Sequence, residues 1–196
     1  MDFIYINKDS ISPDWCSKII STFEKEPNKK KGVTRRGLDI TIKDTLDYMI
    51  GIDVDKNSMW YDINLFLYEE LTKSLLQFDK TIFEKYGFHF FGERLGDTGF
   101  MLQRYTKNVG KFVYHEDFSI RDTTHRVITY IWYLNDVIEG GETEFCGDFR
   151  IKPTAGKLVL FPASWCYPHS GIMPISDDKY IITGWLHVIE DKVFPF

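Results

Sequence analysis

The sequence predicts a single domain that is mainly β with α-helical support, an α+β arrangement. Its 196 residues, 43% hydrophobic and 27% charged, are typical of one globular domain with a sizeable core. Helical periodicity dominates residues 1–95, whereas short alternating runs separated by turn residues fill residues 96–190. Neither an internal repeat nor a linker rich in Pro, Gly or Ser divides the chain. We therefore expect residues 1–95 to supply helical support and entrance loops around a β core.

Composition excludes several classes of protein. A membrane span needs about 18 consecutive apolar residues, and no run approaches that length. Residues 1–9 lack the basic and apolar regions of a secretory signal. The three cysteines are too few and scattered for a disulfide framework, which favours a reducing compartment. A net charge of −5 offers no basic footprint, which disfavours nucleic-acid binding without excluding it. We expect a cytoplasmic monomer or weak homodimer without membrane contact.

Two helices are expected in the first half of the chain. Ser12 can cap the first helix and Pro13 suits its first turn. The apolar residues that follow at helical spacing are Trp15, Ile19, Ile20 and Phe23. The second helix spans about residues 57–85, with Asp79 as a candidate break. One apolar stripe, Trp60, Ile63, Leu67, Leu71 and Leu75, predicts that this helix packs on the outside of a sheet.

A basic segment at residues 28–36 lies between these helices. It has two interpretations. A run of positive charge is typical of a solvated, mobile loop. The same segment could instead form a flap that faces the substrate.

Short strands are expected from about residue 99 onward. They span residues 100–105, 111–115, 126–134, 143–145, 157–161, 166–171 and 180–189. Turn-forming residues separate them at 108–110, 139–141, 153–156 and 176–178. Seven or eight strands at such regular spacing predict a barrel or a sandwich.

One constellation of residues indicates metal chemistry. Residues i and i+2 of a strand share a face, so His115 and Asp117 can point inward together while Glu116 points away. A second histidine would complete the 2-His-1-carboxylate triad that binds Fe(II) with open positions. His169 lies on a late strand, and Lys179 follows ten residues later. The structural alternative is a buried histidine satisfied by a carboxylate, with Lys179 on a surface hairpin.

This arrangement resembles the Fe(II)- and 2-oxoglutarate-dependent dioxygenases, most closely their prolyl 4-hydroxylase-like branch. The likeness extends to much of residues 95–190 and to the opening helix. The matching stretches are residues 105–117, YLN at 133–135, GGETEF at 140–145, 153–161, 181–185 and, near the N-terminus, 11–16. Residues 30–90 are much less diagnostic.

The resemblance implies a double-stranded β-helix, a jelly-roll or cupin-like barrel backed by N-terminal helices. It implies that His115, Asp117 and His169 are catalytic and hold Fe(II), which 2-oxoglutarate chelates. A buried carboxylate needs a compensating charge, and a lysine ammonium can supply it. The residues expected to contact the cosubstrate are Lys179, which would pair with its far carboxylate, and Tyr105, Tyr133, Thr183 and Trp185.

The implied reaction is hydroxylation of a peptidyl proline by O2, coupled to oxidative decarboxylation of 2-oxoglutarate to succinate. Ascorbate is a candidate reductant. A free amino acid or another small metabolite is the alternative substrate for the same chemistry. Nucleic-acid demethylation is disfavoured, because that branch typically anchors 2-oxoglutarate through Arg rather than through a lysine such as Lys179. The non-enzymatic alternative is an inactive barrel that serves as a binding module.

Overall fold

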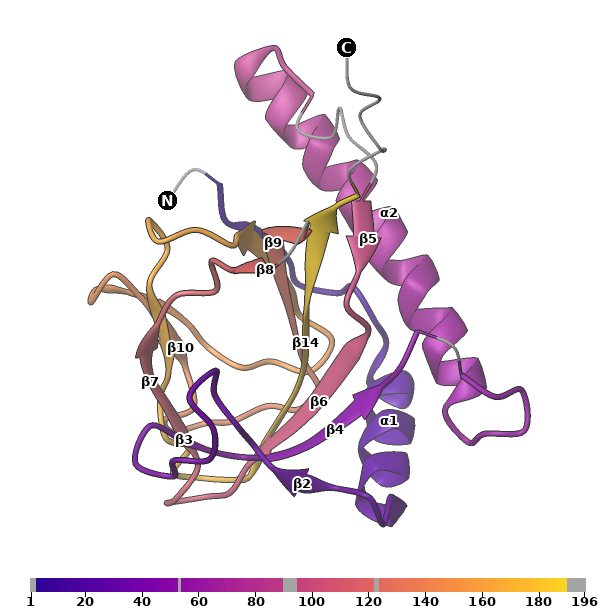
Figure 1. Cartoon of the computed structure of the whole chain (residues 1–196), viewed down its shortest axis with the longest axis vertical. Coiled ribbons are helices and arrows are strands. Elements are labelled where there is room, and N and C mark those ends of the chain that lie inside the picture. The colour runs from indigo at the N-terminus through magenta and orange to yellow at the C-terminus, as the bar shows by residue number, and fades with distance from the viewer. Residues whose placement is uncertain (1–2, 53, 90–94, 122–123, 190–196) are drawn as a thin grey trace.

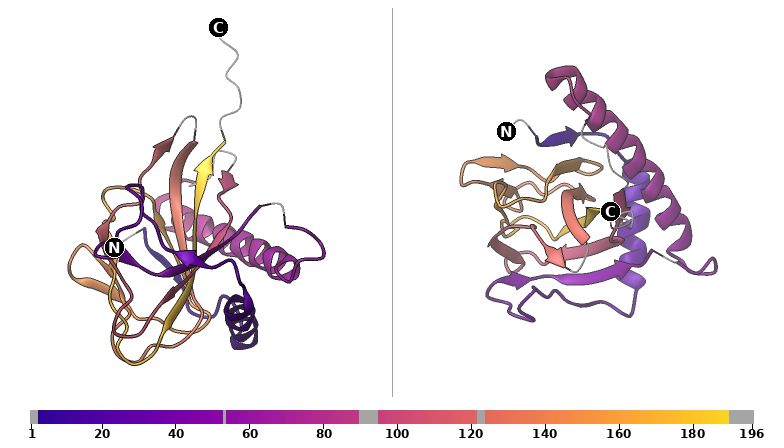
Figure 2. Two further views of the ribbon diagram at one scale, coloured as in Figure 1. Left: turned by 60° about the horizontal axis from the view of Figure 1, so that its bottom comes forward. Right: turned by 45° about the horizontal axis from the view of Figure 1, so that its top comes forward.

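The computed structural model describes residues 3–52, 54–89, 95–121 and 124–189. Two antiparallel sheets face each other, and both helices cover the outside of the larger sheet (Figures 1 and 2). The predicted mainly β domain with α-helical support is therefore confirmed.

The larger sheet has the spatial order β1 (Tyr5–Asn7), β12 (Leu158–Pro162), β9 (Thr124–Tyr133), β14 (Lys179–Val188), β6 (Phe100–Tyr105), β4 (Leu46–Ile50) and β2 (Lys30–Lys31). Two further strands, β5 (Leu95–Asp97) and β8 (Ile120–Arg121), pair with β14 and β9. The smaller sheet has the order β11 (Phe149–Ile151), β10 (Thr143–Phe145), β13 (His169–Gly171), β7 (Lys111–His115) and β3 (Lys43–Asp44). Neighbouring strands thus come from distant parts of the chain.

Helix α1 (Pro13–Lys25) begins where the sequence predicts. The Ser12 hydroxyl accepts a hydrogen bond from the Trp15 amide at 3.4 Å, and proline occupies the first turn. Cys16, Ile19 and Phe23 are buried on one face. The helix thereby presents a single apolar stripe to the larger sheet.

Helix α2 (Tyr61–Tyr86) is continuous, so the candidate break at Asp79 is wrong. The apolar stripe carries on through this point because Phe78 and Ile82 are both buried. Asp79 itself receives an ion-pair contact from His89 and leaves the helix intact. Within the predicted stripe, Ile63, Leu67 and Leu71 are buried against the sheet, as expected.

The predicted strands of the second half correspond closely to the observed ones, with β6, β7 and β10 matching in both bounds. The first half is less helical than expected, because β1, β2, β3 and β4 also lie there. Strands of two residues, such as β2 and β3, are too short to show periodicity. β4 is held by pairing with β6 over its whole length, from Leu46 opposite Arg104 to Ile50 opposite Phe100.

Two apolar cores share the larger sheet. The first fills the space between this sheet and the helices and includes Tyr130 and Trp132. The second lies between the two sheets and includes Tyr133, Phe145 and Phe161. Phe145 and Phe161 both contact the ring of His169, so this second core borders the candidate site.

The three cysteines are free. A search of the described helices finds none with both the length and the apolar character that crossing a bilayer requires. The expected cytoplasmic location stays a prediction.

Replacing Leu67 by Ala should lower the free energy of unfolding by about 2–5 kcal/mol, because the side chain is 0% exposed and its loss leaves a cavity. Leu76→Ala is the matched control on the same helix. Its side chain is 67% exposed, and a surface change of this kind shifts stability by only about 0.5 kcal/mol. Urea denaturation followed by circular dichroism measures both. Equal destabilisation by the two variants would contradict the assigned packing face.

Candidate metal centre and cosubstrate cavity

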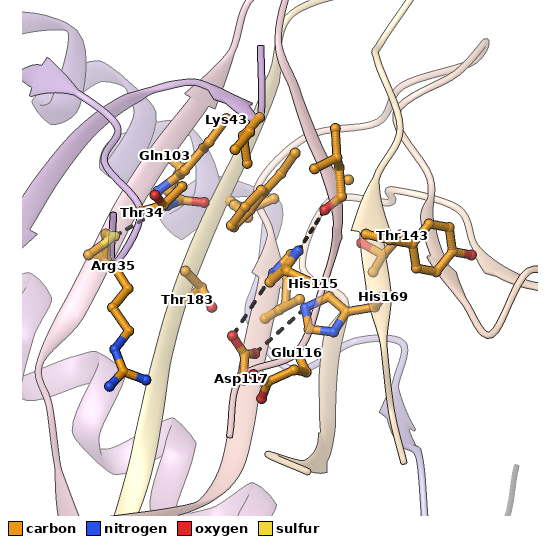
Figure 3. A pocket seen from close by; sticks show the side chains of 18 of the residues that line it. Thr34, Arg35, Lys43, Gln103, His115, Glu116, Asp117, Thr143, His169 and Thr183 are labelled. Carbon is orange, nitrogen blue, oxygen red and sulfur yellow. Dashed lines mark hydrogen bonds and ion pairs between the residues drawn. The ribbon is translucent and has the colours of Figure 1, made fainter. Parts of the chain in front are cut away.

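The pairing of β13 with β7 brings two histidines together. His115 ends β7, His169 opens β13, and the two residues lie opposite each other in the register. Asp117 follows two residues after His115, beyond the strand, and turns back toward both rings (Figure 3). The structure therefore assembles the three side chains that the sequence nominated as metal ligands.

The three side chains offer converging donor atoms. His115 Nε2 lies 4.0 Å from Asp117 Oδ1, and His169 Nε2 lies 3.6 Å from Asp117 Oδ2. One ligand atom from each residue falls within 4.8 Å of the others. Two imidazoles and a carboxylate at this separation match the donor set of a 2-His-1-carboxylate Fe(II) site. The residues present therefore fit the metal.

Hydrogen bonds orient each ligand. The Nδ1 atoms of His115 and His169 lie 2.9 and 3.1 Å from the carbonyl oxygens of Val113 and Tyr167. A carbonyl accepts only, so each Nδ1 carries the proton and leaves Nε2 free to bind a metal. The Thr129 hydroxyl donates to Asp117 Oδ2 at 2.8 Å. All three ligands are thus held by partners outside the triad.

The protonation states also suit a divalent cation. Burial raises the pKa of the Asp117 carboxyl, but His169, His115 and the Thr129 hydroxyl lower that pKa by more, and the net pKa is below its usual value. Burial, followed by the neighbouring His169, lowers the pKa of His115. The site consequently holds a carboxylate beside a neutral imidazole, which are the forms that bind metal.

Packing fixes the His115 ring from its other side. Phe112 stacks on His115 with 3.6 Å between ring centroids and 14° between planes. Lys43 Nζ lies 5.4 Å from the Phe112 centroid and pairs with Asp47 at 2.7 Å. β3 and β4, which the sequence did not predict, therefore reach the metal ligand through Phe112.

Lys179 is a buried cation at the start of β14. Its exposure is 1%, its Nζ donates to the Gly141 carbonyl at 3.0 Å, and the same atom lies 4.0 Å from the Tyr105 ring centroid. Burial lowers the pKa of Lys179 to about 7, and Glu142 opposes this shift. No carboxylate of the described residues forms an ion pair with Nζ. An ammonium has three donors, so Lys179 can still receive an anion.

One cavity of about 1030 Å³ contains both features. The metal triad and Lys179 line it together with Tyr105, Thr183 and Trp185. Figure 3 shows the triad and Thr183. Ligand pockets typically measure about 300–1,000 Å³, so this cavity has room for a small dicarboxylate and part of a second molecule.

The expected cosubstrate residues differ in their access to this cavity. The Tyr105 hydroxyl donates to Gln103 Oε1 at 3.3 Å, and the Thr183 hydroxyl donates to the Tyr130 carbonyl. Tyr133 is fully buried and is not among the described residues that line the cavity. Its hydroxyl donates to Thr143 Oγ1 at 2.6 Å, and Thr143 does line the cavity. Contact between Tyr133 and the cosubstrate stays a prediction.

Several cavity residues were missed by sequence reasoning. They are Lys43, Gln103 and Thr143, whereas Thr34, Arg35 and Arg36 belong to the basic segment for which a substrate-facing flap was one of the two interpretations. Gln103 could have been found from strand parity, since it shares a face with Tyr105. Thr143 belongs to the GGETEF stretch, which already carried the resemblance.

A His-Asp-His triad between two facing antiparallel sheets is the donor set that non-haem Fe(II) oxygenases use. Residues 100–187 match the family model described as the 2OG-Fe(II) oxygenase superfamily. The sequence is also similar to proteins named as probable prolyl 4-hydroxylases. Two from Arabidopsis thaliana, "Probable prolyl 4-hydroxylase 3" and "Probable prolyl 4-hydroxylase 10", are each 30% identical over 118 residues. The match covers 46% of this chain and spans about 40% of the length of those relatives.

Solved structures share the fold over nearly the whole chain. The viral collagen prolyl hydroxylase from Paramecium Bursaria Chlorella virus-1, in a 2OG complex, is 17% identical with a TM-score of 0.64, covering 95% of this chain and 97% of its own. A Pseudomonas putida prolyl-4-hydroxylase is also 17% identical, with a TM-score of 0.66 and coverage of 94% and 92%. At these identities the likeness shows the fold, and the expected double-stranded β-helix is confirmed.

Replacing Thr129 by Val should weaken metal binding by about 10- to 100-fold, because the hydrogen bond that orients Asp117 is lost. Asp117→Ala should abolish specific binding. Anaerobic titration calorimetry with Fe(II) measures both effects.

Glu116→Ala is the matched control for the metal titration. It removes the adjacent, exposed carboxylate, which is outside the ligand cluster, so the affinity for Fe(II) should remain unchanged. Full-affinity binding by Asp117→Ala would contradict the assigned site.

Proposed function

We propose that this protein is an Fe(II)- and 2-oxoglutarate-dependent dioxygenase that hydroxylates a peptidyl proline. The observation that carries the proposal is the shared cavity, in which a three-ligand site and an unpaired buried ammonium lie together. A metal site alone would fit many proteins. A cation placed to receive a second, distant carboxylate fits a dicarboxylate cosubstrate in particular.

Each part of the cavity has a separate task in this proposal. His115, Asp117 and His169 would hold the iron, whose chemistry when bound is the activation of O2. Substrate, O2 and 2-oxoglutarate then yield hydroxylated substrate, succinate and CO2. Lys179 would pair with the far carboxylate of 2-oxoglutarate, and its Tyr105 neighbour would confine that end of the molecule. Thr183 and Trp185 would form the wall beside the metal ligands.

Proline in a peptide is the substrate we favour. The matched relatives are named as prolyl 4-hydroxylases. A prolyl hydroxylase from Trichoplax adhaerens, solved with a hypoxia inducible factor peptide fragment, shares the fold at 18% identity and a TM-score of 0.69 over 95% of this chain and 84% of its own. A free amino acid would need only a closed pocket, whereas this cavity opens between exposed side chains such as Val113 and Phe118.

Purified protein supplied with Fe(II), ascorbate, 2-oxoglutarate and proline-containing peptides should form succinate and a peptide that is 16 Da heavier, a shift set by the mass of one oxygen atom. His115→Ala should abolish both products, because it removes one of three ligands. Mass spectrometry and succinate quantification provide the measurement.

Omission of ascorbate shows whether this reductant is needed. Hydroxylation of free amino acids but not of peptides would contradict the proposed peptide substrate and support the small-molecule alternative. A protein that binds neither Fe(II) nor 2-oxoglutarate would instead be a binding module.

Affinity for 2-oxoglutarate should fall as pH rises above 7. Burial lowers the pKa of the Lys179 amine to about 7. The carboxylate of bound 2-oxoglutarate would raise that pKa, so binding at pH 8.5 requires uptake of a proton. The loss approaches about tenfold per pH unit until the pKa of the bound state is reached. Calorimetry of the Mn(II)-loaded protein in two buffers of different ionisation enthalpy counts the protons. Lys179→Met should bind weakly and without this proton uptake; uptake that persists in it would assign the proton elsewhere.

A further inference from the structure

The segment between β2 and β3 covers one side of the cavity with positive charge. We call residues 32–42 the capping segment. Val33, Thr34, Arg35, Arg36 and Ile42 of this segment line the same cavity as the metal triad. The basic stretch that had two interpretations in the sequence therefore continues into a wall of the candidate site.

A tight turn places the two arginines at the tip of this segment. The backbones of Thr34 and Gly37 exchange hydrogen bonds of 2.9 and 3.0 Å, which leaves Arg35 and Arg36 as the central residues. Gly37 has a φ of 101°, a value that glycine adopts without strain. The Thr34 hydroxyl accepts from the Arg36 amide and donates to the Gly37 carbonyl. Arg35 lines the same cavity as Thr183 and Asp117, and Figure 3 shows its side chain extending away from this turn.

The base of the capping segment is firmly held. Lys43 is 4% exposed and pairs with Asp47, whose same Oδ2 atom also accepts from Gln103 Nε2 at 3.2 Å. Gly32 packs so closely here that a Cβ would lie 2.1 Å from Thr45 Oγ1. The Val113 amide donates to the Ile42 carbonyl at 2.9 Å, which ties the segment to β7. The arginines consequently project from an ordered support rather than from a free loop.

The charge around the cavity mouth is opposite in sign to the net charge of the chain. The protein carries a net charge of −5. Apart from Asp117 and Lys179, the charged lining residues are Arg35, Arg36, Lys43, Arg126 and Glu116. Lys43 is neutralised by Asp47, whereas Arg35 and Arg36 are exposed and form no ion pair with a described residue. Positive charge therefore prevails where a substrate would enter.

Exposed apolar side chains flank these arginines. Val33 is 60% exposed on the capping segment, and Val113, Tyr114 and Phe118 are 41–45% exposed across the cavity. An apolar mouth with positive charge on one side is suited to an extended peptide that carries an acidic side chain. A nucleic acid would call for a broader basic surface, and the chain is acidic overall.

We propose that Arg35 and Arg36 bind a carboxylate side chain of a peptide substrate, within a few residues of the hydroxylated residue. This inference rests on the proposed function for the position of the reacting residue. The two guanidinium groups would give binding energy and register to the peptide, because the charge lies on one side of the cavity only.

Paired fluorescent peptides test the inference by anisotropy. Each peptide contains one proline. The two peptides of a pair differ only at one flanking position, which is Glu in one and Gln in the other. The peptides are titrated with protein that is loaded with Mn(II) and 2-oxoglutarate, a form that permits binding without turnover. The acidic peptide should bind about fivefold more tightly at its best position, and raised salt should shrink this preference.

Charge reversal identifies the residues responsible. Arg35→Glu combined with Arg36→Glu should abolish or invert the preference. Lys25→Glu combined with Lys56→Glu is the matched control, because both lysines are exposed, neither lines the cavity, and the change in net charge is equal. The control should keep the wild-type preference. Unchanged affinity for 2-oxoglutarate in both variants verifies that the cavity remains folded.

Three results would overturn the inference. They are equal binding of Glu and Gln peptides at every position, a preference that survives reversal of both arginines, and tighter binding of single-stranded oligonucleotides or free glutamate than of any acidic peptide. Succinate formation is followed in parallel. A preference for acidic peptides without succinate would refute the proposed function and leave the arginine site standing, whereas succinate without the preference would do the reverse.

Discussion

The antiparallel pairing of β7 with β13 is the contact on which the candidate site depends. It sets His115 opposite His169, and their rings lie 4.3 Å apart between centroids. A register slip of one residue would turn the His169 side chain to the opposite face of its strand, away from His115 and Asp117. The register is secured on both sides, since β13 also pairs with β10 and β7 also pairs with β3. The two histidines of the candidate site thus lie on interior strands of the smaller sheet, where rigid support is greatest.

The same cavity keeps two opposite charges apart. Asp117 and Lys179 are 8% and 1% exposed, yet they form no ion pair with each other. Burying a charge without a partner opposes folding. Asp117 is supported by two histidines and Thr129, whereas Lys179 has a single carbonyl and the Tyr105 ring. A bound cation beside Asp117 and a bound anion beside Lys179 would each compensate one of these buried charges.

Sequence patterns revealed the parts of the molecule that local chemistry determines. The cap at Ser12, the stripe of α2 and the strands of the second half follow from periodicity and turn residues within short windows. The strands β2, β3 and β4 could not be found in this way, because partners far along the chain define them. Arg35 shows the same limit. Its distance from Asp117 in sequence is large, and only the pairing of β3 with β7 brings the two to one cavity.

The family match includes one part of the cavity lining and leaves out another. The family match covers residues 100–187 and contains the His-Asp-His triad and Lys179. The capping segment and the Lys43–Asp47 pair lie outside that match, but they line or support the substrate side of the cavity. Lys43 also lies over Phe112, which stacks on His115, so the N-terminal wall and the candidate metal site are linked through packed side chains. Substitutions in this N-terminal wall can therefore alter the shape and charge of the cavity while the His-Asp-His triad stays in place.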